Sequence, residues 1–173
     1  MTARGFALFD TAIGACGIAW SDAGLVRLQL PERDEQTTRA RLAKRCTTAL
    51  DSSPPPDVQR AIDAIVALLD GEPRDLSFIT LDMDGVPAFH RRVYEVARTI
   101  PPGATLSYGE IANRLGDPGS ARAVGQALGR NPFVIVVPCH RVLAASGKTG
   151  GFSAPGGTAT KLRLLAIEGA HLF

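Results

Sequence analysis

The residue patterns typical of β-strands are confined to the first half of the chain. Apolar side chains alternate with polar ones in residues 5–9, 15–20 and 25–30, and Ser21-Asp22-Ala23-Gly24 is a turn sequence between the last two segments. A similar pattern returns at 76–83, before the turn Asp84-Gly85. After residue 85 the apolar residues follow helical spacing. The sequence therefore predicts an α+β fold in two parts, residues 1–85 and 86–173.

Prolines separate two predicted helices in the first part. Residues 35–50 place apolar side chains on one helical face and arginines on the other, and the run Ser52-Ser53-Pro54-Pro55-Pro56 must end that helix. Asp57 is the predicted N-cap of the second helix, which keeps its apolar period until Gly71. The first part is thus predicted to combine a sheet with two helices.

The second part reads as short helices joined by tight turns. We predict helices at 87–99, 108–115 and 121–128. Ser107 and Glu110 have the Ser-x-x-Glu spacing of a capping box at the start of the second of these helices, and Ser120 can cap the third. The last two helices form a helix-turn-helix candidate, in which Arg122 lies in the first turn of the helix that would face DNA.

Composition excludes several classes of protein. Apolar residues make up 45% and charged residues 21% of 173 residues, which is ordinary for a globular protein and too apolar for a disordered one. The longest apolar run, 133–137, is far shorter than the ~20 residues of a membrane span, and no signal-peptide pattern opens the chain. We therefore expect a cytoplasmic protein without a membrane partner. The net charge of +2 requires any nucleic-acid contact to use a locally basic face.

Three cysteines stand at wide spacings: Cys16, Cys46 and Cys139. An odd number without paired Cys-x-x-Cys spacing fits neither a disulfide framework nor a zinc knuckle, so reduced thiols are expected. Cys16 and Cys46 are interpreted as small core residues. Cys139 differs, because Pro138, His140 and Arg141 are unfavourable neighbours in a plain core strand.

Several motifs surround Cys139 in the second half of the chain. They are Pro138-Cys139-His140-Arg141-Val142, Asn131-Pro132, Ser107-Tyr108-Gly109-Glu110, Ala121-Arg122-Ala123-Val124-Gly125 and Ile167-Glu168-Gly169-Ala170. Together they resemble the O6-alkylguanine-DNA alkyltransferase family over about residues 89–172. The resemblance implies a small RNase H-like N-terminal α/β subdomain with an antiparallel sheet, followed by a mostly helical, winged helix-turn-helix domain that carries the active-site cysteine.

The implied reaction explains the residue types around the thiol. A cysteine is mostly protonated at neutral pH, whereas displacement at an alkoxy carbon needs the thiolate, so a base must lie nearby. His140 can accept the proton of Cys139, and Glu168 can orient the imidazole, which are the roles the family gives to the matching residues. Because adjacent residues of an extended segment point apart, a relay through one water molecule is favoured over direct contact.

The resemblance also assigns the residues that would bind DNA and the flipped base. Tyr108 matches the residue that donates a hydrogen bond to guanine, and Arg122 matches the residue that replaces the extruded base in the duplex. The small residues Ala121, Ala123 and Gly125 would let the helix approach the minor groove. Asn131 resembles a hinge between this helix and the cysteine segment. The implied pocket wall consists of Val142, Phe152 and Ser153.

Two departures from the family pattern affect the pocket. The loop Gly151-Gly157 is longer than in several relatives, and Val134 stands where some have a second proline. Some relatives carry zinc in the first half, but Cys16, Cys46 and His90 lack tight ligand spacing, so we expect no metal and no cofactor. Arg141 is expected to bind backbone carbonyls.

The implied function is single-turnover repair of O6-alkylguanine in double-stranded DNA by a monomer without an obligatory protein partner. Activity on O4-alkylthymine and the preferred alkyl size stay open. A DNA-damage-binding module without catalysis is the alternative, against which Cys139 argues. A cysteine hydrolase is a third reading, although it gives the helix-turn-helix no purpose.

Overall fold

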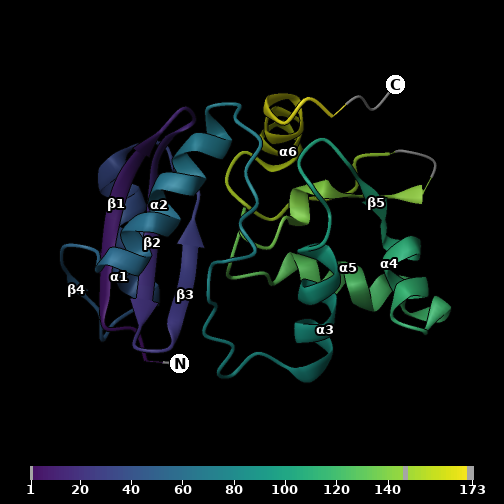
Figure 1. Ribbon diagram of the computed structural model, residues 1–173, viewed down its shortest axis with the longest axis horizontal. Helices are drawn as coiled ribbons and strands as arrows, with labels where there is room; N and C mark the ends of the chain where they lie inside the picture. The colour runs from purple at the N-terminus through teal and green to yellow at the C-terminus, as the bar shows by residue number, and fades with distance from the viewer. Residues whose placement is uncertain (1, 146–147, 171–173) are drawn as a thin grey trace. The chain divides into compact units, whose positions relative to one another are not determined.

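A computed structural model describes residues 2–145 and 148–170 and has an α+β fold (Figure 1). Its contacts divide the chain into two compact units, residues 1–85 with 132–136, and residues 86–131 with 137–173. The segment 132–136, expected in the second part, belongs to the first. Its position follows from the hydrogen bond from the Leu28 amide to the Pro132 carbonyl and from the bridge between Leu28 and Phe133.

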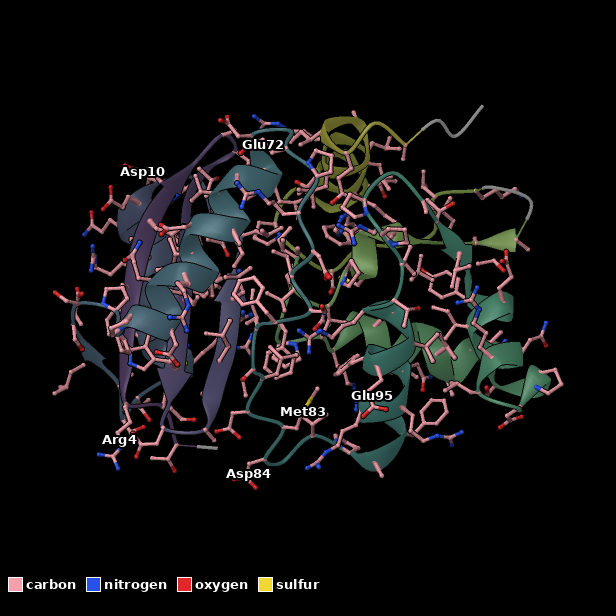
Figure 2. The ribbon with its side chains drawn as sticks, viewed as in Figure 1. Arg4, Asp10, Glu72, Met83, Asp84 and Glu95 are labelled. Carbon is pink, nitrogen blue, oxygen red and sulfur yellow. The ribbon has the colours of Figure 1, made fainter. Side chains whose placement is uncertain are left out.

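The first unit is built on a four-stranded sheet. Its strands are β1 (Gly5–Thr11), β2 (Gly14–Ser21), β3 (Gly24–Gln29) and β4 (Leu50–Asp51), in the order β3-β2-β1-β4. The three predicted strands are confirmed as an antiparallel meander, whereas β4 pairs parallel to the start of β1. In Figure 2, Arg4 and Asp10 lie toward opposite ends of β1, at the periphery of this unit.

Helix α1 (Glu35–Arg45) packs on one face of the sheet. Leu42 and Cys46 bury their side chains against Phe6, Ala19 and Val26, which point to the same face. The prediction of a helix over 35–50 was too long. At Cys46 the backbone leaves helical geometry, and residues 50 and 51 pair with β1, a tertiary interaction that helical periodicity does not reveal.

Helix α2 (Pro56–Leu69) crosses in front of the strands in Figure 1 and buries one apolar side. The predicted cap was wrong: Pro55 is the N-cap, and Asp57 lies inside the first turn. Proline is well suited to the first helical position because its missing N–H has no intrahelical partner there. Gly71, with a φ of 98°, follows the helix as predicted.

The predicted strand at 76–83 is not formed. The segment turns, with the Ile79 amide bound to the Leu76 carbonyl, and meets β3 only through an isolated bridge between Leu25 and Leu81. The hydroxyl of Ser21 donates to the carboxylate of Asp82 and fixes the end of the segment beside the sheet. The alternating apolar residues at 76–83 therefore belong to an irregular segment that lies along β3 without adding a strand to the sheet.

The second unit is mostly helical. Its elements are α3 (Ala88–Ala97), β5 (Leu106–Ser107), α4 (Tyr108–Arg114), η1 (Pro118–Ser120), α5 (Ala121–Gly129), η2 (Cys139–Arg141), β6 (Val142–Leu143) and α6 (Gly157–Ile167). Strands β5 and β6 pair in parallel. The three predicted helices are confirmed, with no end displaced by more than two residues. Among the described residues, no helix has the length and apolar character needed to cross a membrane.

Local capping fixes the start of α4. The Ser107 hydroxyl accepts from the Glu110 amide and the Glu110 carboxylate accepts from the Ser107 amide, so the predicted capping box is confirmed. Ser120 occupies the N-cap position of α5 as predicted, but its hydroxyl donates to the Asp117 carbonyl instead of capping the helix. Helix α5 is then held from its inner side, where the Tyr94 hydroxyl donates to the Ala127 carbonyl at 2.7 Å.

Candidate active site

Cys139 begins the 3-10 turn η2 at the end of a sharply bent segment. The Cys139 amide bonds to the Val137 carbonyl and the Arg141 amide to the Pro138 carbonyl, so the extended conformation expected for this segment is wrong. Upstream, Ile135 has a φ of 76°, a region that costs a β-branched residue about 1–3 kcal/mol.

His140 and Glu168 are in direct contact. The Nε2 atom of His140 lies 3.0 Å from both carboxylate oxygens of Glu168, and the two side chains are 0% and 3% exposed. Facing a carboxylate, Nε2 is assigned the proton, which leaves Nδ1 with a lone pair. Nδ1 is buried and has no hydrogen-bond partner in the described part of the chain. The imidazole is thus held by one nitrogen and can accept a proton at the other.

Arg141 completes this buried charge cluster. Its Nε and Nη2 atoms donate to the two oxygens of Glu168 at 2.8 and 2.7 Å, and Nη1 donates to the Ile100 carbonyl at 2.6 Å. The expected tie to a backbone carbonyl is confirmed, but the bidentate ion pair was missed. The sequence could have predicted this ion pair, because a glutamate buried beside His140 needs a permanent cation and Arg141 is the next residue in the chain.

These contacts set the protonation states of the pair. Burial raises the pKa of Glu168, but the hydrogen bonds and charges of Arg141 and His140 outweigh it and lower the pKa to about 2. Burial lowers the pKa of His140 below its ordinary value, and Glu168 opposes only part of that change. At neutral pH the site therefore holds an ionised carboxylate and a neutral imidazole, the form that can act as a base.

The thiol of Cys139 is 9% exposed and is protonated at rest. Burial raises its pKa, while the Asn131 side chain and the Lys161 ammonium group oppose part of the rise. The Asn131 amide also donates to the Val137 carbonyl at 2.8 Å, which places it between the end of α5 and the cysteine segment. A thiol in this setting needs a base at the moment of reaction.

Lys161 was not identified from the sequence. Its side chain lies on α6, is 0% exposed, and donates from Nζ to the Val142 carbonyl at 2.7 Å and the Gly151 carbonyl at 3.3 Å. Lysine is seldom buried, so its residue type alone does not indicate a place in the site. Helical spacing could have found it, because Lys161 is three and four residues before the buried Leu164 and Leu165.

Cys139 opens into a pocket of about 400 Å³ within the second unit. The lining residues are Tyr108, Gly125, Leu128, Gly129, Cys139, Gly151, Phe152 and Ser153. Of the predicted site residues, five line this pocket, whereas His140, Glu168, Asn131 and Val142 do not. A volume of this size can hold a purine base.

The loop after Gly150 forms one wall of the pocket. The Ser153 hydroxyl donates to the Gly129 carbonyl at 2.9 Å and ties this loop to the end of α5. Gly150 has a φ of 69°, and a Cβ atom there would lie 2.9 Å from the Tyr108 hydroxyl oxygen. Glycine at this position therefore lets the loop pass close to Tyr108.

The predicted DNA-facing residues lie on α5. Arg122 is exposed, Ala121, Ala123 and Gly125 are partly exposed, and the opposite side of the helix is buried. Arg122 does not line the pocket. Within the described residues, no group of three or more His, Cys, Asp or Glu side chains is arranged to hold a metal ion.

The helical unit thus presents one buried cysteine to a base-sized pocket, backed by an imidazole and a carboxylate, which defines a protein with a thiol nucleophile. The family model for 6-O-methylguanine DNA methyltransferase, DNA binding domain, matches residues 88–170. The methylated-DNA–protein-cysteine methyltransferase of Methanothermobacter thermautotrophicus is 39% identical over 156 residues, 90% of this chain and 80% of the relative. The chain belongs to the methylated-DNA–protein-cysteine methyltransferase family.

Other relatives agree with this assignment and with the fold. The enzyme of the same name from Mycolicibacterium paratuberculosis is 40% identical over 94% of this chain and 90% of its own length. The crystal structure of the Mycobacterium tuberculosis protein in complex with DNA has a TM-score of 0.73 and 37% identity, covering 95% of this chain and 92% of that one. The O6-methylguanine-DNA methyltransferase of Pyrococcus kodakaraensis also has a TM-score of 0.73, at 28% identity. The family and the α+β fold implied by the sequence motifs are confirmed.

Proposed function

We propose that the protein repairs DNA by moving the alkyl group of O6-alkylguanine onto the sulfur of Cys139. A carbon–sulfur bond forms as the carbon–O6 bond breaks, and guanine leaves with the electron pair. The observation that carries the proposal is the position of Cys139 at the pocket, backed by the buried His140 and Glu168. The thiolate is a poor leaving group from the resulting thioether, so the alkyl group stays on Cys139 and each molecule reacts once.

The proton of Cys139 passes to Nδ1 of His140 through one water molecule. Nδ1 is the nitrogen that Glu168 leaves available, and the buried carboxylate stabilises the imidazolium ion that forms. Arg141 acts on this step through Glu168, because its two hydrogen bonds keep the carboxylate ionised. The cluster therefore supplies a base without a permanent positive charge on the imidazole at rest.

Tyr108 stabilises the departing guanine. Its side chain lines the pocket, and burial raises the pKa of its hydroxyl, so the group stays protonated and can donate to the base. A donor aimed at the negative charge that develops on guanine lowers the barrier.

The partner is double-stranded DNA, which α5 contacts through Arg122 and its small neighbours. The M. tuberculosis relative was crystallised with DNA. The second unit carries ten Lys or Arg and four Asp or Glu residues, a formal charge of +6, so it has the locally basic character that phosphate contacts require. The target base rotates out of the stack into the pocket while Arg122 fills its place. A reaction that needs a reduced thiol supports a cytoplasmic location.

Intact-protein mass spectrometry tests the proposal. One equivalent of duplex DNA with O6-methylguanine should add one methyl mass, located on the Cys139 peptide, and Cys139→Ala should abolish transfer while retaining DNA binding. DNA binding without any mass gain would favour a damage-binding module. Repeated turnover with an unmodified thiol would favour a hydrolase.

The role of Arg122 has its own test. Arg122→Ala should slow transfer from duplex DNA far more than from free O6-benzylguanine, since a free base needs no extrusion, and a mismatch opposite the lesion should partly restore the rate. Tyr108→Phe is the matched comparison and should slow both reactions alike. Equal slowing of both by Arg122→Ala would contradict a role in extrusion.

A further inference from the structure

We propose that Lys161 is a positioning residue for alkyl transfer: its ammonium group fastens the pocket loop to β6 and stabilises the thiolate of Cys139. The proposal rests on the transfer reaction inferred above. It concerns a side chain with no place in the cysteine, histidine and glutamate relay.

The first part of the argument is geometric. Nζ of Lys161 bonds the Val142 carbonyl on β6, three residues after the nucleophile, and the Gly151 carbonyl in the loop that walls the pocket. The same atom lies 5.9 Å from the centre of the Tyr108 ring, which forms another part of the wall. One buried group thus connects three elements around the pocket, and its loss would free the loop.

The second part concerns charge compensation. Burying an ammonium ion is costly unless an anion is near, and neutral carbonyls satisfy its hydrogen bonds without balancing its charge. In residues 2–145 and 148–170 no carboxylate forms an ion pair with Lys161, and Glu168 is already bound by Arg141 and His140. The thiolate that forms at Cys139 during the reaction is the anion available to balance this charge.

The electrostatic effect is mutual. Burial lowers the pKa of Lys161 and Cys139 opposes that change, while Lys161 opposes the rise in the pKa of Cys139 that burial causes. Tyr94 and Tyr108 also interact electrostatically with Cys139, and a backbone hydrogen bond of His140 opposes the rise in the pKa of the thiol. Arg141 and Lys161 lower the pKa of the His140 side chain, and Glu168 raises it. A negative charge on either tyrosine would repel the Cys139 thiolate. The Lys161 ammonium group attracts the thiolate and so favours its formation.

Four variants separate charge from hydrogen bonding. Lys161→Met removes both at similar length, Lys161→Gln retains a donor without charge, and Lys161→Arg retains both. Lys148→Met is the matched control, because it removes the same charge from an exposed position in the same half of the chain. Thermal unfolding monitored by circular dichroism establishes which variants are folded, and Lys161→Gln carries the test if Lys161→Met is not.

The main measurement is the rate at which iodoacetamide modifies Cys139 as a function of pH, read from the mass of the Cys139 peptide. This small reagent reports the thiolate independently of any alkyl transfer from DNA, so it distinguishes failure of this proposal from failure of the proposed function. Lys161→Met and Lys161→Gln should shift the midpoint upward by one pH unit or more, a tenfold loss of rate below the midpoint, while Lys161→Arg and Lys148→Met stay near wild type.

Transfer from O6-benzylguanine then tests the fastening of the loop. Lys161→Met should lose more rate in this reaction than the loss of thiolate explains, and Lys161→Gln should recover part of the excess. An unchanged iodoacetamide profile in a folded Lys161→Met or Lys161→Gln protein would overturn the electrostatic role. Equal losses with both reagents would overturn the role in the loop.

Discussion

The two units of the molecule differ in net charge and in the solvent exposure of their ion pairs. The first has nine Lys or Arg and thirteen Asp or Glu residues, a formal charge of −4, against +6 for the second. Four acidic residues are labelled in Figure 2: Asp10, Glu72 and Asp84 belong to the first unit and Glu95 to the second. Ion pairs of the first unit lie at its surface, as with Arg4 and Asp22, whose side chains are 68% and 78% exposed. The second unit buries the charges of Arg141, Lys161 and Glu168.

Cysteines show the same contrast. Cys16 is buried in the first unit beside the Thr11 hydroxyl, and burial raises its pKa to about 12. Cys139 is also buried, but an amide, an ammonium group and an imidazole with its carboxylate surround it. Burial alone makes a thiol inert, whereas burial among polar groups prepares it for reaction. Arg141, Lys161 and Glu168 are buried in the second unit, whose pocket contains Cys139, whereas the buried Asp82 of the first unit accepts a hydrogen bond from the Ser21 hydroxyl.

Thiol reactivity offers the largest expected difference between the units. In native protein at pH 8, iodoacetamide should modify Cys139 at least ~100-fold faster than Cys16, because Cys139 lines an open pocket whereas Cys16 is closed to solvent. Peptide mass spectrometry over time measures the ratio, and unfolding in guanidinium should abolish it. Comparable native rates for the two thiols would contradict the contrast.

Removal of one charge from the buried cluster should destabilise the protein strongly. Glu168→Gln leaves Arg141 buried without its counter-ion, so we expect a loss of about 3–5 kcal/mol in the free energy of unfolding. Asp22→Asn, which removes the exposed pair with Arg4, is the control and should have an effect too small to resolve. Urea denaturation measures both. Similar losses in the two variants would mean that burial does not distinguish the ion pairs.

Acid should act on the second unit through the same glutamate. The folded-state pKa of Glu168 is about 2 and its ordinary value is 4.5, so its stabilising effect is present above about pH 4.5 and is lost as the pH falls toward 2. The difference corresponds to about 3 kcal/mol. His140, with a lowered pKa, adds a loss that begins below its ordinary value of 6.5. The stability difference between wild type and Glu168→Gln should therefore shrink as pH falls; a constant difference from pH 7 to pH 3 would refute the linkage.

Local sequence signals predicted much of the fold, and nonlocal contacts account for the errors. Alternation and turn residues located β1 to β3, and the Ser107 capping box fixed the start of α4. The end of α1 and the irregular course of 76–83 depend on pairing with distant strands, which periodicity cannot express. The assignment of 132–136 to the first unit likewise depends on a bond from Leu28.

The same distinction between local sequence signals and nonlocal contacts applies to the residues of the site. Motifs around Cys139, His140 and Glu168 carried the family resemblance, and the structure places the latter two in contact. Lys161 and the ion pair from Arg141 were missed because lysine and arginine are assumed to be solvated unless their surroundings are known. Their partners are backbone carbonyls and a residue 27 positions away, which the sequence does not identify by type or spacing.

Helix capping offers the smallest expected effect. It tests whether a local change in each unit alters only stability or also the rate of alkyl transfer. Asp34 caps α1 in the first unit, and Ser107 caps α4 in the second, where Tyr108 is the next residue. Ser107→Ala should reduce stability by about 1 kcal/mol and slow transfer from O6-benzylguanine a few-fold, because the first turn of α4 carries Tyr108 into the pocket. Ser107→Thr retains the acceptor and should restore both quantities. Asp34→Ala removes the corresponding bond to the Thr37 amide and should lower stability without changing the transfer rate of the folded protein. Thermal unfolding and single-turnover rates measure the two effects, and an equal slowing of transfer by both alanine variants would show that the first unit also shapes the reactive site.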